Sequence, residues 1–186
     1  MDSQIKTFTE RANNELVLSG KIKLMSEDDE AKEFLEIESK MTFYSSVISH
    51  SYYAIFYAAK ALLLTKNIKT DSPNVHKKTL DEFKKNFVDT GELDISLLNI
   101  YKEMIVRADE LLEIFKSEKG KRGKFTYKTL PQANKEPAED SLKNAKKFVS
   151  NINKVIENKT AKNKAVGVAG KELKKWTREL FNLEKR

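Results

Sequence analysis

Apolar residues recur every three or four positions along almost the whole chain, and this spacing constrains the fold more than any other feature of the sequence. It is clearest at residues 48–62, 98–115 and 138–156. Runs that alternate between apolar and polar residues, as half-buried strands would, are absent from the sequence. An apolar stripe of this period occupies one face of a helix and favours packing at shallow angles. The sequence therefore predicts an all-α fold, an up-and-down bundle of four to five helices.

The segment 42–66 is predicted to be the central helix of this bundle. Aromatic and aliphatic residues lie on nearly all of its sides, and a helix of this kind must be covered by several neighbours. Its small residues form a track along which another helix can approach closely: Ser51, Ala54, Ala58 and Ala61.

The sequence favours a soluble, cytoplasmic protein that does not enter a membrane. The first fifteen residues are polar and lack the apolar core of a signal peptide. The most apolar run, residues 52–64, is shorter than the ~20 residues that a membrane span needs.

Residues that typically begin or end helices divide the remaining sequence. Further helices are predicted at about 2–25, 74–88 and 94–118, and Thr90-Gly91 and Asp94 mark two of the helix ends. Residues 119–135 break the pattern with two glycines and a proline before a helix restarts.

The chain is predicted to consist of a bundle and a C-terminal appendage. The bundle covers residues 1–157 and includes an acidic insertion at about 26–40. Residues 158–186 form a basic linker (NKTAKNK) and an amphipathic helix. The apolar stripe of that helix has spacings of 3, 4, 3, 4 and 3 and consists of Val166, Ala169, Leu173, Trp176, Leu180 and Leu183.

Composition excludes several kinds of chemistry. The chain contains no cysteine, which removes disulfides, cysteine-based zinc sites, iron–sulfur clusters and thiol catalysis. It has only two histidines, and the acidic run 27–38 lacks the ligand spacing and glycine of a calcium loop. We therefore expect neither a metal nor a cofactor.

Charge is distributed unevenly. Residues 1–93 carry 13 bases and 15 acids, whereas residues 94–186 carry 22 bases and 13 acids. Residues 116–135 alone hold seven bases and one acid. Such asymmetry indicates an acidic partner, nucleic acid included, although a lysine-rich soluble surface has the same composition.

The segment HSYYAIFYAAKALLLTKNI, residues 50–68, resembles the signature helix of the HEPN family, with its tyrosine pair, alanine-rich turn and aliphatic end. Residues 72–94 resemble the next family element, in which a histidine (here His76) opens a helix that a short turn follows. Residues 138–152 are similar to the closing helix of the family. The resemblance covers roughly residues 42–157 and implies a helical bundle.

The segment from Arg122 to Tyr127 resembles the arginine-plus-tyrosine loop of the same family, with Thr126 where the family commonly has aspartate. Many HEPN proteins are endoribonucleases that use an arginine followed after four to six residues by a histidine. Here the corresponding positions hold Tyr127, Lys128 and Thr129. Tyrosine, with an ordinary pKa of about 10, is a poor general base. We therefore predict no catalytic residue. Arg122 and Tyr127 are assigned to phosphate contact and base stacking, or to a structural corner at the dimer interface.

The predicted ligand-binding residues combine this loop with two side chains of the preceding helices. His76 contributes only if it reaches the Arg122 loop across the bundle, and otherwise it packs or caps its helix. The tyrosines of the central helix either line a groove for a base or belong to the core. The predicted set is Arg122, Tyr127, Lys121, Lys124, His76 and Tyr53.

The resemblance also implies partners. Small HEPN proteins often accompany a minimal nucleotidyltransferase in a toxin–antitoxin-type or nucleotide-handling pair, and they form homodimers. We therefore predict a homodimeric module that binds a nucleotide, RNA or a protein partner. One alternative is an atypical metal-independent endoribonuclease that uses Arg122 with Tyr127 or a distant histidine. A second is a structural helical adaptor whose function lies in the Trp176 helix.

Overall fold

The computed structural model describes the backbone of residues 2–120 and 135–183, and the side chains of residues 2–110 and 135–162. Over these ranges every regular element is a helix, which confirms the predicted all-α class. The helices are α1 (Asp2–Glu27), α2 (Asp29–Phe34), α3 (Tyr44–Leu64), α4 (Val75–Phe83), α5 (Ile95–Gly120) and α7 (Lys135–Leu183). A π-helical segment, Lys84–Val88, continues α4.

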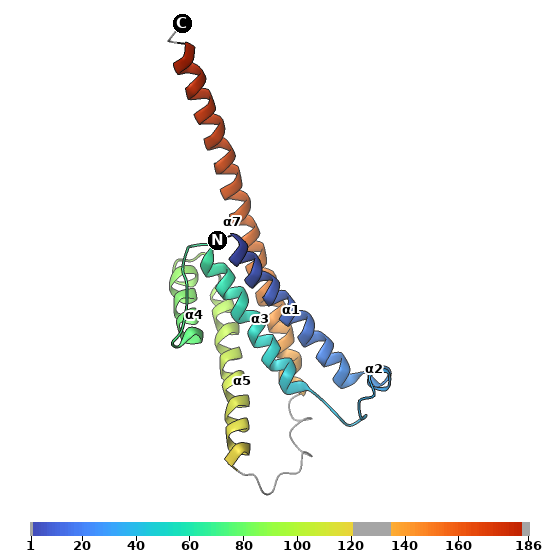
Figure 1. Ribbon diagram of the computed structural model, residues 1–186. Coiled ribbons are helices and arrows are strands. Elements are labelled where there is room, and N and C mark those ends of the chain that lie inside the picture. Colours follow the sequence, from blue (N-terminus) through green and yellow to red (C-terminus); the bar gives the residue numbers. More distant parts are fainter. Residues whose placement is uncertain (1, 121–134, 184–186) are drawn as a thin grey trace.

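Helices α1, α3, α5 and α7 alternate in direction along the chain and form the bundle (Figure 1). The short helix α4 packs against α3, and α2 lies beyond the C-terminal end of α1. The predicted up-and-down arrangement is therefore confirmed.

Helix α3 is central, as its composition predicts. It contacts α1, α4, α5 and α7, and each residue of its small-residue track is at most 1% exposed. By length and composition alone α3 is long and apolar enough to cross a membrane, but 72% of the apolar window is buried inside the protein. This burial is typical of the core helix of a helical bundle.

Three aromatic side chains join the helices around α3. Phe83 of α4, Tyr101 of α5 and Phe148 of α7 are all 0% exposed. Their ring centroids lie 5.5–5.8 Å apart, and Tyr101 meets both phenylalanines edge-on. This edge-to-face geometry is favourable for aromatic pairs, so the cluster fixes how α4, α5 and α7 approach one another.

The predicted boundary between the helices at 74–88 and 94–118 is confirmed. Gly91 has φ of 72°, a left-handed conformation that glycine adopts without steric cost, and its N–H donates to the Val88 carbonyl at 2.9 Å. Asp94 then caps α5, because its Oδ1 accepts a hydrogen bond from the Ser96 N–H at 2.7 Å.

The C-terminal third differs from the prediction. Helix α7 runs without interruption from Lys135 to Leu183, so residues 158–164 are helical rather than a linker. No glycine or proline occurs between Pro137 and Gly167, and lysine, asparagine and threonine weaken a helix only slightly. Lys159 also pairs with Glu92 in the turn before α5, which holds this part of α7 against the bundle.

The amphipathic C-terminal segment is consequently a continuation of α7 and not a separate element. It projects past the ends of the other helices (Figure 1). The division of the chain into units at 1–157 and 158–186 stays a prediction.

Candidate ligand-binding site

Two of the six predicted ligand-binding residues, Tyr53 and His76, lie in the described part of the chain, and the structure places them side by side. Their ring centroids are 6.4 Å apart. The other four lie outside the described residues: Lys121, Arg122, Lys124 and Tyr127.

Helix α3 presents three aromatic rings to His76, which lies in the first turn of α4. Tyr52, Tyr53 and Phe56 occupy positions i, i+1 and i+4 and so share one side of α3. The His76 ring lies 5.6 Å from the ring of Tyr52 and 4.3 Å from that of Phe56. The tyrosine pair and the histidine, which are 23–24 positions apart in sequence, therefore form one cluster.

A short hydrogen bond orients His76. The Tyr52 hydroxyl oxygen and His76 Nδ1 are 2.6 Å apart. Burial raises the pKa of Tyr52, and the neighbouring Tyr53 and Asp109 raise it further, so its hydroxyl keeps its proton. Among the described residues His76 is the one partner of this buried hydroxyl, which therefore donates to Nδ1. The neutral imidazole then carries its proton on Nε2.

His76 is held in the neutral form near neutral pH. Burial lowers its pKa, the positive charge of Lys60 lowers it further, and Asp109 opposes both effects. In this state Nε2 is a hydrogen-bond donor, and the basic nitrogen Nδ1 is occupied by Tyr52. The geometry suits binding of an acceptor group better than general-base catalysis.

The lowered pKa of His76 predicts a pH dependence of stability. The unfolded chain binds a proton at His76 near the ordinary pKa of 6.5, and the folded chain binds it only at lower pH. The free energy of unfolding should therefore fall as the pH drops from about 7.5 to about 5.5. Melting temperatures over this range should fall less in His76→Asn, which keeps an acceptor for Tyr52.

The matched control for this measurement is His50→Asn, since His50 is the only other histidine in the chain. Glu92 and Asp94 have lowered pKa values and titrate below this window. Equal pH slopes for the wild type and His76→Asn would show that His76 does not contribute.

A row of aromatic rings with adjacent cations continues from Tyr53 toward α1. Tyr53 is 40% exposed and stacks on Tyr57, with centroids 6.1 Å apart. Tyr57 in turn stacks on Phe8 of α1 at 6.0 Å. The Arg11 guanidinium lies 5.7 Å from the Tyr57 ring centroid, and Lys60 Nζ lies 5.0 Å from that of Phe8. We call these five residues the aromatic face.

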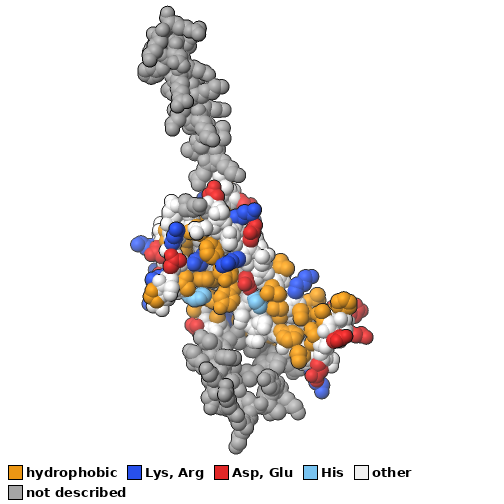
Figure 2. All heavy atoms as spheres, viewed as in Figure 1, with side chains coloured by type: hydrophobic (Ala, Val, Ile, Leu, Met, Phe, Trp, Pro, Cys, Tyr) orange, Lys and Arg blue, Asp and Glu red, His pale blue; other side chains and the backbone are white. Residues whose placement is uncertain are grey.

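The contributions of α1 and Lys60 to this face were not predicted from the sequence. Phe8 has the helical spacing of a core residue, and nothing local indicates that it meets Tyr57 across the bundle. Both histidines are visible beside hydrophobic side chains in Figure 2. His50, in contrast to His76, already has an acidic partner, because its Nδ1 lies 2.6 Å from Glu15 Oε2.

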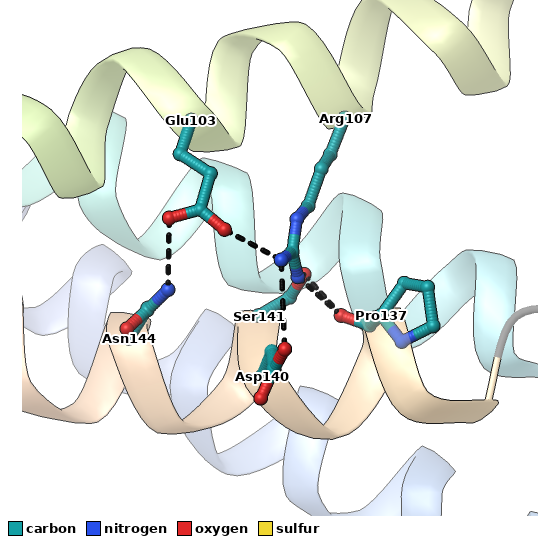
Figure 3. A network of polar contacts seen from close by, with 6 residues as sticks. All are labelled: Glu103, Arg107, Pro137, Asp140, Ser141 and Asn144. Atoms are coloured by element: carbon teal, nitrogen blue, oxygen red, sulfur yellow. Dashed lines mark hydrogen bonds and ion pairs between the residues drawn. The ribbon is translucent and has the colours of Figure 1, made fainter.

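Arg107 fixes the two helices that flank residues 121–134. From α5, Nη1 donates to the Pro137 carbonyl at 2.7 Å and to Ser141 Oγ at 3.0 Å, both in the first turns of α7 (Figure 3). Nη2 donates to Glu103 Oε1 at 2.5 Å and lies 3.6 Å from Asp140 Oδ2. The Arg107 side chain is 19% exposed. It is a positioning residue, since it holds α5 and α7 in register on either side of residues 121–134.

A polar cavity of about 390 Å³ lies where α1 ends and α7 begins. Three lysines line it, namely Lys32, Lys40 and Lys135, and the last of these directly follows the 121–134 segment. The other lining residues are Ser26, Glu27, Ser39, Thr42 and Tyr44. Among the described residues no group of three or more histidine or acidic side chains is placed to hold a metal ion.

Comparison with known proteins identifies the family. The sequence profile of the HEPN domain matches residues 29–155, more than half of the chain. The chain belongs to the HEPN domain family. The resemblance of the α3 segment is thereby confirmed, and the HEPN match also includes most of the acidic stretch 26–40, which the sequence analysis treated as an insertion.

The HEPN chain is similar to two provisionally named toxins of Methanocaldococcus jannaschii. One is 38% identical over 81 residues, which are 44% of this chain and 53% of that protein. The other is 32% identical over 114 residues, 61% of this chain and 72% of that protein. A UPF0332 protein of Thermotoga maritima is 31% identical over 112 residues, 60% of this chain and 72% of that protein. The chain thus spans about half the length of the first relative. No solved structure matches this HEPN chain.

Proposed function

We propose that this toxin-type HEPN protein binds a nucleotide or RNA, using residues 121–134 together with the aromatic face. The observation that carries the proposal is the exposed ring of Tyr53, flanked by His76 and by the stacked rings of Tyr57 and Phe8. An exposed aromatic ring offers a base a stacking surface whatever its sequence.

The charged groups near these rings favour an anionic ligand. Arg11 and Lys60 already lie beside the aromatic rings, and neutral His76 offers a donor at Nε2. The loop adds Lys121, Arg122 and Lys124, and arginine is suited to bidentate contacts with phosphate. In this proposal the loop binds the phosphates, Tyr127 and Tyr53 stack on bases, and Arg107 holds the ends of the loop.

Two relatives support a protein partner for the proposed module. Both Methanocaldococcus jannaschii relatives are named as toxins, and the toxin of a toxin–antitoxin pair acts with an antitoxin. We propose a cytoplasmic homodimer that pairs with a minimal nucleotidyltransferase in this role. The adaptor alternative assigns partner capture to the C-terminal part of α7 instead.

Binding to a labelled single-stranded RNA, measured by fluorescence anisotropy, tests the ligand site. Loss of one stacked base costs roughly 1–3 kcal/mol, so Tyr53→Ala should weaken binding about 5- to 150-fold. Arg122→Ala should weaken it about tenfold or more, because a charge-assisted phosphate contact is lost. Tyr53→Phe keeps the ring and should bind like the wild type.

Lys84→Ala is the charge-matched control, since Lys84 is an exposed cation in the π-helical segment. Its affinity should fall only slightly. Unchanged binding by both Arg122→Ala and Tyr53→Ala would refute the assignment of this site.

The same RNAs, incubated with the wild type in EDTA, test the endoribonuclease alternative. We expect no cleavage, because no histidine follows Arg122 at the required spacing and Tyr52 occupies Nδ1 of His76. Cleavage by the wild type that disappears in Arg122→Ala would establish an enzyme and replace the binding-module proposal.

A further inference from the structure

Large apolar side chains are exposed at the end of the bundle formed by the second half of α1, by α2 and by the loop that follows. Phe34 is 87% exposed and Val17 is 62% exposed. Figure 2 shows hydrophobic side chains gathered over this end of the molecule. We call the set the α1–α2 patch: Val17, Leu18, Leu24, Phe34, Leu35 and Met41. A concentration of exposed apolar side chains of this kind marks an interaction site.

The border of the α1–α2 patch is predominantly acidic, and the exposed bases Lys21 and Lys40 are outnumbered by exposed acids. The one base between residues 27 and 38, Lys32, is 6% exposed and donates to the Ser39 carbonyl at 2.6 Å, so its charge is withdrawn from the surface. The exposed acids around the patch are Asp29, Glu30, Glu33, Glu36 and Glu38. An apolar surface with an acidic border fits an amphipathic helix whose polar side is basic.

The chain itself contains a helix of this chemistry. Residues 163–183 of α7 carry five bases and two acids, and their sequence has the apolar stripe that includes Leu173 and Trp176. The same residues project past the bundle (Figure 1). The basic charge of this segment therefore complements the acidic border of the α1–α2 patch, and its apolar stripe matches the apolar side chains of the patch.

The fold separates the two surfaces within one chain. The projecting part of α7 leaves the bundle at the end opposite α2 (Figure 1). It therefore points away from the α1–α2 patch of its own chain, and contact between them requires a second molecule.

The dimensions agree with reciprocal docking between two copies. Asn153 of α7 contacts Asn13 of α1, so α7 passes the N-terminal end of α1 near residue 164. The projecting part, which ends at Leu183, is therefore about 28 Å long at about 1.5 Å per residue. Residues 17–27 of α1 and the six residues of α2 are about 16 Å and 9 Å long. With two copies side by side in an antiparallel, two-fold arrangement, each projecting segment can lie along the partner's α1–α2 patch, and the assembly closes at two copies.

We propose that the α1–α2 patch binds residues 166–183 of a second copy of this chain, and that the exchange is reciprocal. This interface does not involve the aromatic face or the 121–134 loop, so it stands whether or not the protein binds RNA.

Trp176 provides a direct readout because it is the only tryptophan in the chain. Val17→Asp and Phe34→Asp alter the patch and leave Trp176 in place. Sedimentation velocity of the full chain should show a wild-type dimer and at least a tenfold weaker association in each variant, since a buried apolar contact is lost. The fluorescence emission of Trp176 should shift to longer wavelength in the same variants. Val106→Asp replaces an exposed apolar residue of α5, 56% exposed and outside the patch, and should change neither quantity.

Disulfide trapping identifies the contact even where a second interface holds the dimer. The chain has no cysteine, so Leu24→Cys and Leu173→Cys each introduce a single thiol. On mixing under mild oxidation, the two variants should form the mixed disulfide far faster than Val106→Cys does with Leu173→Cys. A monomeric wild type, Trp176 emission that is insensitive to the patch variants, or equal trapping of both mixtures would overturn the proposal.

Discussion

Phe148→Ala is expected to lower the free energy of unfolding by about 3–5 kcal/mol, because a large buried ring is lost from the centre of the bundle. Phe148 is completely buried and contacts Phe83 of α4 and Tyr101 of α5. Truncation removes the transfer free energy of the ring and leaves a cavity that three helices border and cannot readily close. Urea denaturation followed by circular dichroism measures the change.

Tyr101→Phe is the matched control for Phe148→Ala. The Tyr101 hydroxyl is buried and has no hydrogen-bond partner among the described residues. Removing an unpaired buried hydroxyl keeps the ring contacts and ends a desolvation cost. We expect the stability of Tyr101→Phe to equal or exceed that of the wild type. A loss similar to that of Phe148→Ala would mean that the hydroxyl has a partner.

Arg107→Ala is expected to cost about 2–3 kcal/mol, because it removes charge-assisted hydrogen bonds and leaves the Pro137 carbonyl and the buried Ser141 hydroxyl without their cation. It should also weaken RNA binding without altering any residue of the loop, because α5 and α7 lose their fixed register. Urea denaturation and the anisotropy assay measure the two effects separately.

Two further variants distinguish geometry from charge at this position. Arg107→Lys keeps the charge, but a single ammonium group cannot reproduce the fork that contacts α7 and Glu103 together, so we expect little rescue. Glu103→Gln, at a side chain 45% exposed, should cost less than about 1 kcal/mol because solvent screens the pair. Full rescue by lysine would show that charge alone matters.

The sequence was sufficient for the long helices of the bundle, because burial imposes a period that the spacing of apolar residues reveals directly, but it did not indicate the short helix α2. The central position of α3 was predictable from the apolar residues on all its sides. Gly91, with its left-handed backbone, and Asp94, with its capping carboxylate, marked the boundary between two helices through local interactions alone. The expected linker at 158–164 was wrong because polar composition resembles a loop, whereas a helix continues wherever no residue interrupts it.

The candidate site was only partly predictable. Tyr53 and His76 each stood out in the sequence, but their contact depends on how α4 packs on α3. Arg11 and Phe8 approach Tyr57 only after α1 and α3 pair, and Arg107 shows no local sign that it will bridge to α7. Contacts between segments that are distant in sequence produce no periodic pattern. The helices can therefore be predicted from the sequence, but the clusters of side chains that form between them cannot.

The central position of α3 also has a consequence for folding during synthesis. Helix α3 is flanked early by α1, which precedes it, but its other cover includes residues 138–156 of α7. Those residues are made roughly 90 positions after Leu64, a delay of roughly 5–20 seconds at ordinary translation rates. Until α5 is made, early in that interval, the most apolar helix of the chain has only one long partner, α1. Nascent chains therefore depend on α1 to cover α3 early in synthesis. Mutations that weaken the packing of α1 on α3 should lower the yield of soluble protein more than their effect on the free energy of unfolding would indicate.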